Sequence, residues 1–270
     1  MRLFETHTHY DDEAFGEDRD QVLERVYHSG VQRIVNQGAS LRGCRDTLKL
    51  MEQYPFLYGA IGVHPEECGD MTMEDLAWIE ETCKNDKCVA IGEIGLDYYW
   101  PEPDREIQKK WFAEQLELAR RVKLPVVIHS RDAAVDTMEI LKAHKAEEIG
   151  GVIHCFSYSK ELAREYVKIG FFIGVGGVVT FKNGVKLKEV VQEIPLEHIV
   201  LETDSPYLAP VPNRGKRNDS GNLLYVAREI ASIKGLSPEE VCETTWENAC
   251  RLYRLPIADD KEGILEAYDS

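Results

Sequence analysis

The chain has 270 residues, with 48 Asp and Glu against 32 Lys and Arg, and carries a formal net charge of −16. Its hydrophobic content of 43% and charged content of 30% are those of an ordinary globular protein and exclude a disordered chain, a collagen-like chain and a disulfide-stapled miniprotein. The charge also argues against a protein that coats long stretches of DNA, because such binding depends on many Lys and Arg contacts to phosphate. A small nucleic-acid site with local positive charge stays open.

The N-terminal residues and the cysteines predict a cytoplasmic protein that does not enter a membrane. The N-terminus lacks the long apolar run of a secretory signal, and no window approaches the ~20 apolar residues of a membrane span. The seven cysteines are scattered without a CxxC pair, so we expect reduced thiols rather than disulfides or a cysteine metal site.

Short apolar runs alternate with longer amphipathic stretches along the chain. The runs predict strands at Leu3–His9, Gln32–Asn36, Leu57–His64, Val89–Leu96, Val126–Ser130, Val152–Phe156, Phe171–Val175 and Ile199–Thr203. Helices are predicted near 18–29, 41–53, 73–84, 104–122, 132–146, 160–168, 185–193, 221–234 and 238–253.

Eight strands that each precede a helix predict a parallel sheet, and the chain length fits closure into a (β/α)8 TIM-type barrel. A doubly wound open sheet is the alternative, but no GxGxxG or Walker A spacing supports a nucleotide-binding version of it. No linker divides the chain, so we expect a single domain over residues 1–270, with an acidic, peripheral tail over 256–270. The long predicted loop over 204–220 is of a length that is usually functional or mobile.

Five of the eight histidines lie near the C-terminal ends of predicted strands, where barrel enzymes collect their active sites. His7 and His9 are two residues apart on the first strand and therefore point to the same face, which Glu5 is also predicted to share. Imidazole is the commonest neutral metal ligand, so two inward histidines favour a metal site over a buried core. The other three are His64, His129 and His154.

Three carboxylates join these histidines. Glu93 lies within an apolar strand, where a carboxylate is unfavourable to bury unless it is paired or bound to a metal. Asp204 follows the eighth strand, and Glu202 shares its face. One catalytic metal needs about three protein ligands plus water, so a larger set predicts two cations with Glu93 as the bridge. The six predicted ligands are His7, His9, Glu93, His129, His154 and Asp204.

The ligand set divides between neighbouring strands. His7, His9 and Asp204 would hold one cation, because the first and last strands of a closed barrel are neighbours; His129 and His154 would hold the other. Two metals ~3.5–4 Å apart activate water and stabilise the leaving oxygen of a phosphate ester. Histidine ligands suit Zn²⁺, Mn²⁺ or Fe²⁺, and the carboxylates leave Mg²⁺ open. A purely structural site is disfavoured, because such sites are usually cysteine-rich.

Further residues are candidates for substrate contact. Arg131 follows His129 by two residues and could grip a phosphate, although a salt bridge with Asp132 or Asp136 is an equal alternative. His64 is expected to contact substrate or protonate the leaving group, against the alternative of a buried, hydrogen-bonded histidine. Glu202 is counted among the expected substrate-binding residues, and it is also expected to orient a ligand histidine from behind.

Aromatic and basic residues also fall in the predicted loops. Tyr98 and Tyr99 follow the strand of Glu93 and could stack on bases or act as a lid. Basic residues in the loops after the seventh and eighth strands would add positive charge at the barrel mouth, unless they are simply solvated. They are Lys182, Arg214, Lys216 and Arg217.

Six motifs occur in one order along the chain: Thr6-His7-Thr8-His9, Gly62-Val63-His64-Pro65, the run from Ala90 to Tyr99, His129-Ser130-Arg131-Asp132-Ala133, His154-Cys155-Phe156-Ser157 and the run from Glu202 to Leu208. As a set, over residues 1 to about 253, they resemble the TatD family of metal-dependent deoxyribonucleases. The resemblance implies a barrel of the amidohydrolase-like group, two divalent cations and 3′→5′ exonuclease hydrolysis of DNA. It implies metal roles for the same six residues and substrate contacts for His64 and Arg131.

Two positions depart from the family pattern. Glu5 stands where the family usually has Asp, and Arg217-Asn218-Asp219-Ser220 stands where it often reads Arg-Asn-Glu-Pro. The first could change the geometry behind the histidine pair, and the second could change the turn before the helix near residue 221.

We therefore expect a two-metal phosphodiesterase in which Glu93, Asp204 and His64 are catalytic and Asp204 accepts a proton from the attacking water. The cations and Arg131 would make one positive mouth on an acidic body, suited to single-stranded DNA or a strand end rather than a long duplex. A hydrolase of a small amide, ester or lactone is the first alternative, since a fold does not determine its function. A noncatalytic metal-binding scaffold is the second.

Overall fold

The computed structural model describes residues 1–258, so residues 259–270 of the predicted tail lie outside the described part. Its eight strands form one sheet in the order β1 to β8, and every neighbouring pair is parallel. The strands are β1 (Leu3–Thr8), β2 (Val31–Gly38), β3 (Leu57–Ile61), β4 (Cys88–Asp97), β5 (Val126–Arg131), β6 (Gly151–Ile153), β7 (Phe171–Val175) and β8 (Ile199–Leu201).

The first and last strands meet and close the ring. The backbone N–H of His9 donates to the carbonyl of Ser205 at 2.8 Å, and the N–H of Asp204 donates to the carbonyl of His7 at 3.0 Å. Thr8 and Ser205 form a parallel bridge at the same place. The predicted (β/α)8 barrel is confirmed.

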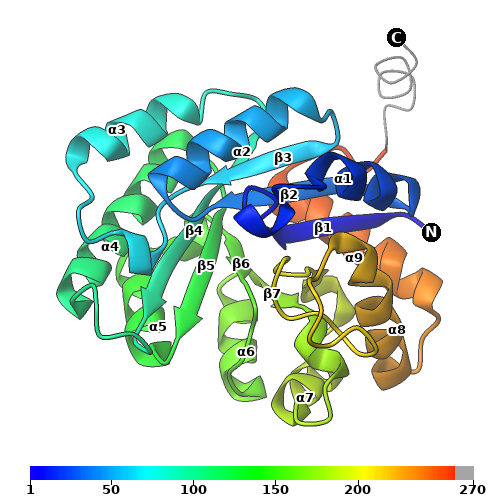
Figure 1. Ribbon diagram of the computed structural model, residues 1–270. Coiled ribbons are helices and arrows are strands. Elements are labelled where there is room, and N and C mark those ends of the chain that lie inside the picture. The colour runs from blue at the N-terminus through cyan, green and yellow to red at the C-terminus, as the bar shows by residue number, and fades with distance from the viewer. Residues whose placement is uncertain (259–270) are drawn as a thin grey trace.

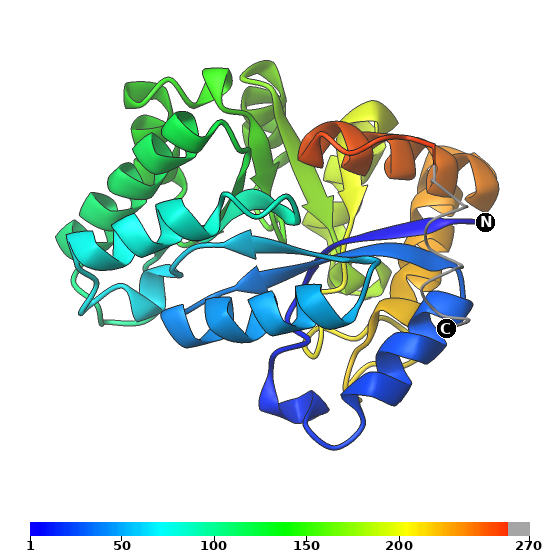
Figure 2. The same cartoon turned by 90° about the horizontal axis from the view of Figure 1, so that it is seen from above.

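Helices lie outside the strands and surround them (Figures 1 and 2). They are α1 (Arg19–His28), α2 (Leu41–Gln53), α3 (Met73–Thr82), α4 (Arg105–Val122), α5 (Ala134–Ala143), α6 (Lys160–Lys168), α7 (Val185–Glu193), α8 (Leu223–Lys234) and α9 (Pro238–Tyr253). Short 3-10 helices are η1 (Glu13–Phe15), η2 (Pro65–Glu67), η3 (Ala146–Glu148), η4 (Gly177–Thr180), η5 (Leu196–His198) and η6 (Ser220–Asn222). Within residues 1–258, no helix has both the length and the apolar character needed to cross a membrane.

Helix α4 shows how the sequence forms and seats these helices. Asp104 accepts a hydrogen bond from the N–H of Glu106 and so caps the first turn. Trp111, Phe112 and Leu116 recur at helical spacing and are buried, which turns one face of the helix to the barrel. Burying such a side chain contributes about 1.5–3 kcal/mol.

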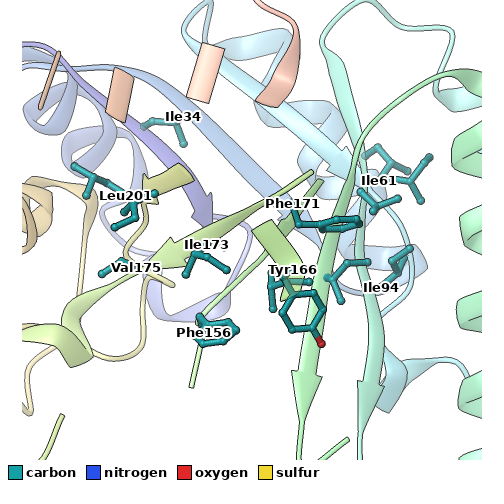
Figure 3. Packing of buried hydrophobic residues seen from close by; sticks show 14 of the residues in the cluster. Ile34, Ile61, Ile94, Phe156, Tyr166, Phe171, Ile173, Val175 and Leu201 are labelled. Atoms are coloured by element: carbon teal, nitrogen blue, oxygen red, sulfur yellow. The ribbon is translucent and has the colours of Figure 1, made fainter. Parts of the chain in front are cut away.

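The apolar core has two layers. One lies between strands and helices, and Figure 3 shows its members from several strands, including Ile61, Ile94 and Ile173. The other gathers one or two residues from nearly every strand together with Trp246 and Tyr253 of α9, so it fills the interior of the ring. The strand residues of this inner layer are Phe4, Val35, Ala60, Val89, Ala90, Val127, Val152 and Val200. The inner apolar layer lies on the side of the ring that α9 covers. The polar side chains lie at the other end of the ring, where the strands have their C-terminal ends.

Several strands end before the predicted boundaries. Strands β1, β3, β6 and β8 stop one to three residues short of the predicted ends, so that His9, His64 and His154 lie just beyond their strands. The register between β1 and β2 is irregular between Glu5 and Thr8. The strand ladder stops where the chain turns these polar side chains toward one another.

Candidate metal centre

The six predicted ligands come together at the C-terminal end of the barrel in two groups. The first donor set consists of His7 Nε2, His9 Nε2, Asp204 Oδ1 and Glu93 Oε2. The two ring nitrogens lie 3.3 Å apart. From Glu93 Oε2, His7 Nε2 lies 3.3 Å away and His9 Nε2 3.6 Å away. From Asp204 Oδ1 the same two nitrogens lie at 3.7 and 3.5 Å.

The second donor set uses the other oxygen of the same glutamate. It consists of His129 Nδ1, His154 Nε2 and Glu93 Oε1. The oxygen lies 3.0 Å from His129 Nδ1 and 2.9 Å from His154 Nε2, and the two nitrogens are 3.4 Å apart. Glu93 therefore stands between the sets with one oxygen toward each, and its side chain is almost fully buried.

The spacing within the sets fits a cation. Ligand atoms placed tetrahedrally at ~2.0–2.1 Å from one ion are roughly 3.3–3.4 Å apart. Five distances within the first set fall between 3.3 and 3.7 Å. The second set supplies three donor atoms, which leaves room for a further ligand. His7 Nε2 and His9 Nε2 lie 3.3 Å apart, and a cation between them would bind the lone pairs of both neutral rings.

Hydrogen bonds at the outer ring nitrogens orient two of the histidines. His9 Nδ1 lies 3.2 Å from the carbonyl oxygen of Gln37, to which it can only donate, so the neutral ring has its lone pair on Nε2, toward the first set. His129 Nε2 lies 2.8 Å from Asp97 Oδ2, which likewise leaves Nδ1 free to bind a cation. His154 Nδ1 lies 3.8 Å from Glu202 Oε1, beyond hydrogen-bond distance, and has no hydrogen-bond partner among residues 1–258, so the predicted orienting role of Glu202 stays a prediction.

The sequence analysis assigned no role to Asp97. In the structure, its carboxylate is the partner of His129 Nε2 and so orients a predicted ligand. Its side chain is fully buried at the end of β4, four residues after Glu93 and on the same side of the strand. A second buried carboxylate at that spacing was the available signal.

His64 differs from the four ligand candidates. Its Nδ1 accepts a hydrogen bond from the N–H of Glu66 at 3.2 Å, so the neutral ring carries its proton on Nε2. That Nε2 lies 3.6 Å from Glu93 Oε1 and faces the centre. His64 thus presents a hydrogen-bond donor, not a lone pair, to the site. Burial, together with the charge of His129, lowers its pKa to about 3, so the ring is neutral near pH 7.

The charges of the cluster compensate one another. Burial by itself would raise the pKa of Glu93, but the charges of His154 and His7 hold it well below its usual range. Burial lowers the pKa of His7 to about 4, with a contribution from the charge of His154. Against the effect of burial, hydrogen bonds to Asp97 and Glu93 raise the pKa of His129 to about 9. Without a cation, protonation of some of these histidine rings balances the negative charge of the carboxylates.

Glu5 does not join the centre. Its Oε1 accepts from the backbone N–H of His7 at 3.1 Å and of Thr203 at 2.9 Å, and its Oε2 accepts from Thr203 Oγ1 at 2.6 Å. The expectation that Glu5 shares the face of His7 and His9 is wrong, because the irregular register of β1 breaks the simple alternation at this point. Glu5 instead ties β1 to β8 directly behind the histidine pair.

The departure at 217–220 preserves an ordered turn. The amide nitrogen of Asn218 donates to the carbonyls of Thr203 at 2.9 Å and Tyr207 at 2.7 Å. Asp219 accepts from the N–H of Gly221 and caps η6. The segment 204–220, yellow in Figure 1, lies beside the end of β1, where Tyr207 donates to Asp12 at 2.8 Å.

The basic residues near the mouth have different surroundings. Arg131 has no carboxylate within salt-bridge distance among residues 1–258, and Asp136 instead pairs with Lys109 at 2.8 Å, so the structure does not form the alternative salt bridge. Arg217 is bound to Asp18 at 2.6 Å and contributes less free charge than expected. Arg214 lies over the ring of Phe181, and Lys182 and Lys216 are exposed.

A cavity of about 420 Å³ opens beside the first donor set. Its lining includes Asp204, Glu202 and Cys155 but is largely apolar, with Phe156 and Leu208 among the lining residues. Its size lies within the range of about 300–1,000 Å³ typical of small-molecule sites.

Known proteins share the sequence pattern of this chain. The sequence model of the family described as "TatD related DNase" matches residues 4–254. The chain is 47% identical over 253 residues to the protein of Bacillus subtilis named "Uncharacterized metal-dependent hydrolase YabD", with 94% of this chain and 99% of that protein covered. It is 35% identical to the Escherichia coli K12 protein "Uncharacterized metal-dependent hydrolase YcfH", with coverage of 94% and 97%.

A solved structure agrees with the barrel as well. The crystal structure of the TatD homologue YjjV from Escherichia coli K12 superposes with a TM-score of 0.89 at 32% identity, covering 94% of this chain and 99% of that one. A hydrolase of the TatD family from Entamoeba histolytica superposes with a TM-score of 0.84 at 26% identity, covering 94% and 98%. With the family pattern present over nearly its whole length, this chain belongs to the TatD family of metal-dependent hydrolases.

Proposed function

We propose that this chain is a two-metal deoxyribonuclease that hydrolyses the phosphodiester bonds of DNA, as a 3′→5′ exonuclease. The observation that carries the proposal is the position of Glu93, which turns one oxygen to each donor set and so lets two cations share one carboxylate. Two cations held this way would lower the pKa of an attacking water and offset the charge of the phosphate oxygens. Mg²⁺, Mn²⁺ and Zn²⁺ are the candidates.

The protein groups around the centre divide the remaining work. Asp204 has the most exposed carboxylate of the first donor set, at 18%, and the hydrogen bond with His9 outweighs burial and lowers its pKa, so it is ionised and can accept a proton from water. The Nε2–H of His64, which faces the centre, would donate to a phosphate oxygen. Arg131 can bind another phosphate oxygen, since no carboxylate of residues 1–258 lies within salt-bridge distance of its guanidinium, and Asp136 pairs with Lys109 instead.

A panel of substrates tests the proposal. The protein is stripped of metal, reconstituted separately with Mg²⁺, Mn²⁺ and Zn²⁺, and assayed on a 3′-labelled and a 5′-labelled single-stranded oligonucleotide. We expect metal-dependent release of mononucleotides from the 3′ end, and two equivalents of metal per chain. Release from the 5′ end would overturn the direction, and no turnover of DNA with any metal would overturn the deoxyribonuclease.

The hydrolysis of a small amide, ester or lactone is the second candidate, and the cavity beside Asp204 favours it. A largely apolar cavity of about 420 Å³ suits a small molecule. Assays of small esters, amides and lactones with the same reconstituted protein distinguish the two. Turnover of one of these that exceeds turnover of DNA would select the second candidate.

A further inference from the structure

Two exposed aromatic side chains stand beside the candidate metal centre and have no role in the chemistry proposed above. Tyr99 and Trp100 lie two and three residues after the end of β4 and are 54% and 50% exposed. Their ring centroids lie 4.8 Å apart with an interplanar angle of 89°. The two rings therefore form a corner in which a flat group can stack on one ring and meet the other with its edge.

The corner is connected to the second donor set by a single carboxylate. Asp97 Oδ1 accepts from the backbone N–H of Tyr99 at 2.9 Å. Asp97 Oδ2 lies 2.8 Å from His129 Nε2, whose other nitrogen belongs to the second donor set. The same side chain thus fixes the orientation of a ligand histidine and the start of the aromatic segment, which places the corner at a set position relative to the centre.

The segment is also held at both ends by Gln108 of α4. The side chain of Gln108 accepts from the N–H of Asp97 and donates to the carbonyls of Asp97 and Pro103, each at 2.9 Å. Tyr98 is not available for stacking, since its hydroxyl donates to Asp136 at 2.6 Å and its ring is partly buried against the apolar core. A corner that is already ordered loses little conformational entropy when it binds a ligand.

Arg131 adds positive charge to the corner. Its guanidinium carbon lies 3.8 Å from the centroid of Tyr99, and it has no carboxylate within salt-bridge distance in the described part of the chain. Arg131 is the partner of Asp97 in the register of β4 and β5 and lies two residues after His129, so its backbone is next to both the aromatic segment and the second donor set. Aromatic faces next to an unpaired guanidinium are the combination that binds unpaired nucleobases and their phosphates.

We propose that Tyr99, Trp100 and Arg131 form a stacking platform for an unpaired nucleobase of single-stranded DNA. The platform rests on the proposed function, because it holds a base next to the phosphate that the centre would cleave. A base within a duplex is stacked on both faces and cannot enter the corner. The platform therefore makes the enzyme prefer single strands, and Trp100, the ring that Arg131 does not cover, contributes most to binding.

The test measures binding separately from cleavage. The metal-loaded protein is titrated into a fluorescein-labelled phosphorothioate decanucleotide, single-stranded or as a blunt duplex, and the anisotropy gives Kd. The variants are Trp100→Ala, Trp100→Phe, which keeps an aromatic face, and Ile257→Ala, an exposed apolar residue that follows α9 and is 46% exposed. Far-UV circular dichroism confirms that each variant is folded. Cleavage of a natural oligonucleotide is compared with that of bis(4-nitrophenyl) phosphate, a diester without bases.

Trp100→Ala should weaken single-strand binding about tenfold, because stacking on one base is worth that much or more, and should change duplex binding less than twofold. It should lower kcat/KM for the oligonucleotide at least fivefold more than for the small diester. Trp100→Phe should restore most of the binding, and Ile257→Ala should match the wild type. Single-strand binding by Trp100→Ala at wild-type strength, or no single-strand binding by the wild type, would overturn the platform. Tight binding without cleavage would instead overturn the deoxyribonuclease and leave the platform standing.

Discussion

The two donor sets share Glu93 but keep their negative charge in different places. The first set contains a carboxylate of its own, Asp204, next to His7 and His9. The second set contains only histidines besides the shared glutamate, and its carboxylates stand behind the rings, with Asp97 at His129. We infer that the first set binds a cation more tightly, because it has a second carboxylate as a direct ligand. The second set has fewer donor atoms and less negative charge next to the cation, which leaves a coordination position for substrate.

The largest effect is expected where the sets meet. Glu93→Gln removes the charge shared by both sets, so we expect bound metal to fall well below two equivalents and phosphodiesterase activity to fall by at least about 10³-fold. Metal analysis after dialysis and a steady-state assay measure this. The melting temperature of the metal-free variant should stay within a few degrees of the metal-free wild type. Full activity in this variant would show that the sets do not share the carboxylate.

Replacing Asp204, the carboxylate that belongs to the first set alone, should weaken metal binding at the first set and leave the second set able to bind. Asp204→Asn keeps the size of the side chain but loses its charge and its capacity to accept a proton. We expect about one equivalent of metal to be retained and activity to fall by about 10²–10³-fold. Titration with metal by calorimetry should then show the weaker site only. Retention of two tight sites would remove the difference between the sets.

Replacing Asp97, the carboxylate behind the second set, should reduce activity less than replacing Asp204. Asp97→Asn weakens the partner of His129 Nε2 without removing a ligand, so we expect metal affinity at one of the two sites to fall by about 10- to 100-fold. Excess metal should recover most of the activity. Asp136→Asn, which alters a carboxylate paired with Lys109 outside the centre, serves as the control. Equal loss at both sites would contradict the assignment of Asp97 to the second set.

The smallest effect is expected for Glu5, which lies behind the first set, and it concerns the free energy of unfolding. Burial raises the pKa of Glu5 from 4.5 to about 8 in the metal-free protein. The native state therefore holds this proton over a pH range in which the unfolded chain has lost it, and stability falls as pH rises from about 4.5 to about 8.

Glu5→Gln should remove this dependence. In metal-free buffer, the free energy of unfolding of the variant relative to the wild type should rise across that range by an amount on the order of 2–4 kcal/mol, as measured by urea denaturation at a series of pH values. Glu247→Gln, at an exposed position on α9, should follow the wild-type slope. A difference between Glu5→Gln and the wild type that does not change with pH would contradict the raised pKa.

By itself the sequence predicted the barrel, which the structure confirms, and six candidate ligands that the fold brings together at one end of it. Strand and helix periodicity reveal eight alternating units, and parallel strands in a closed ring must bring their C-terminal ends together. Histidines and carboxylates at those ends therefore had to meet, wherever the exact strand boundaries fell. This is why His129 and His154, 25 residues apart in the chain, could be assigned to one set.

Only the tertiary structure decided which atom of each group faces the centre. The N–H of Glu66 makes His64 a donor, and Asp97 makes Nδ1 the available nitrogen of His129; neither follows from spacing along the chain. The irregular register of β1 turned Glu5 to Thr203, and the pairing of Arg217 with Asp18 removed a charge expected at the mouth. Periodicity determines the face of an element on which a residue lies, whereas protonation and pairing depend on hydrogen-bond partners that the fold brings from distant parts of the chain.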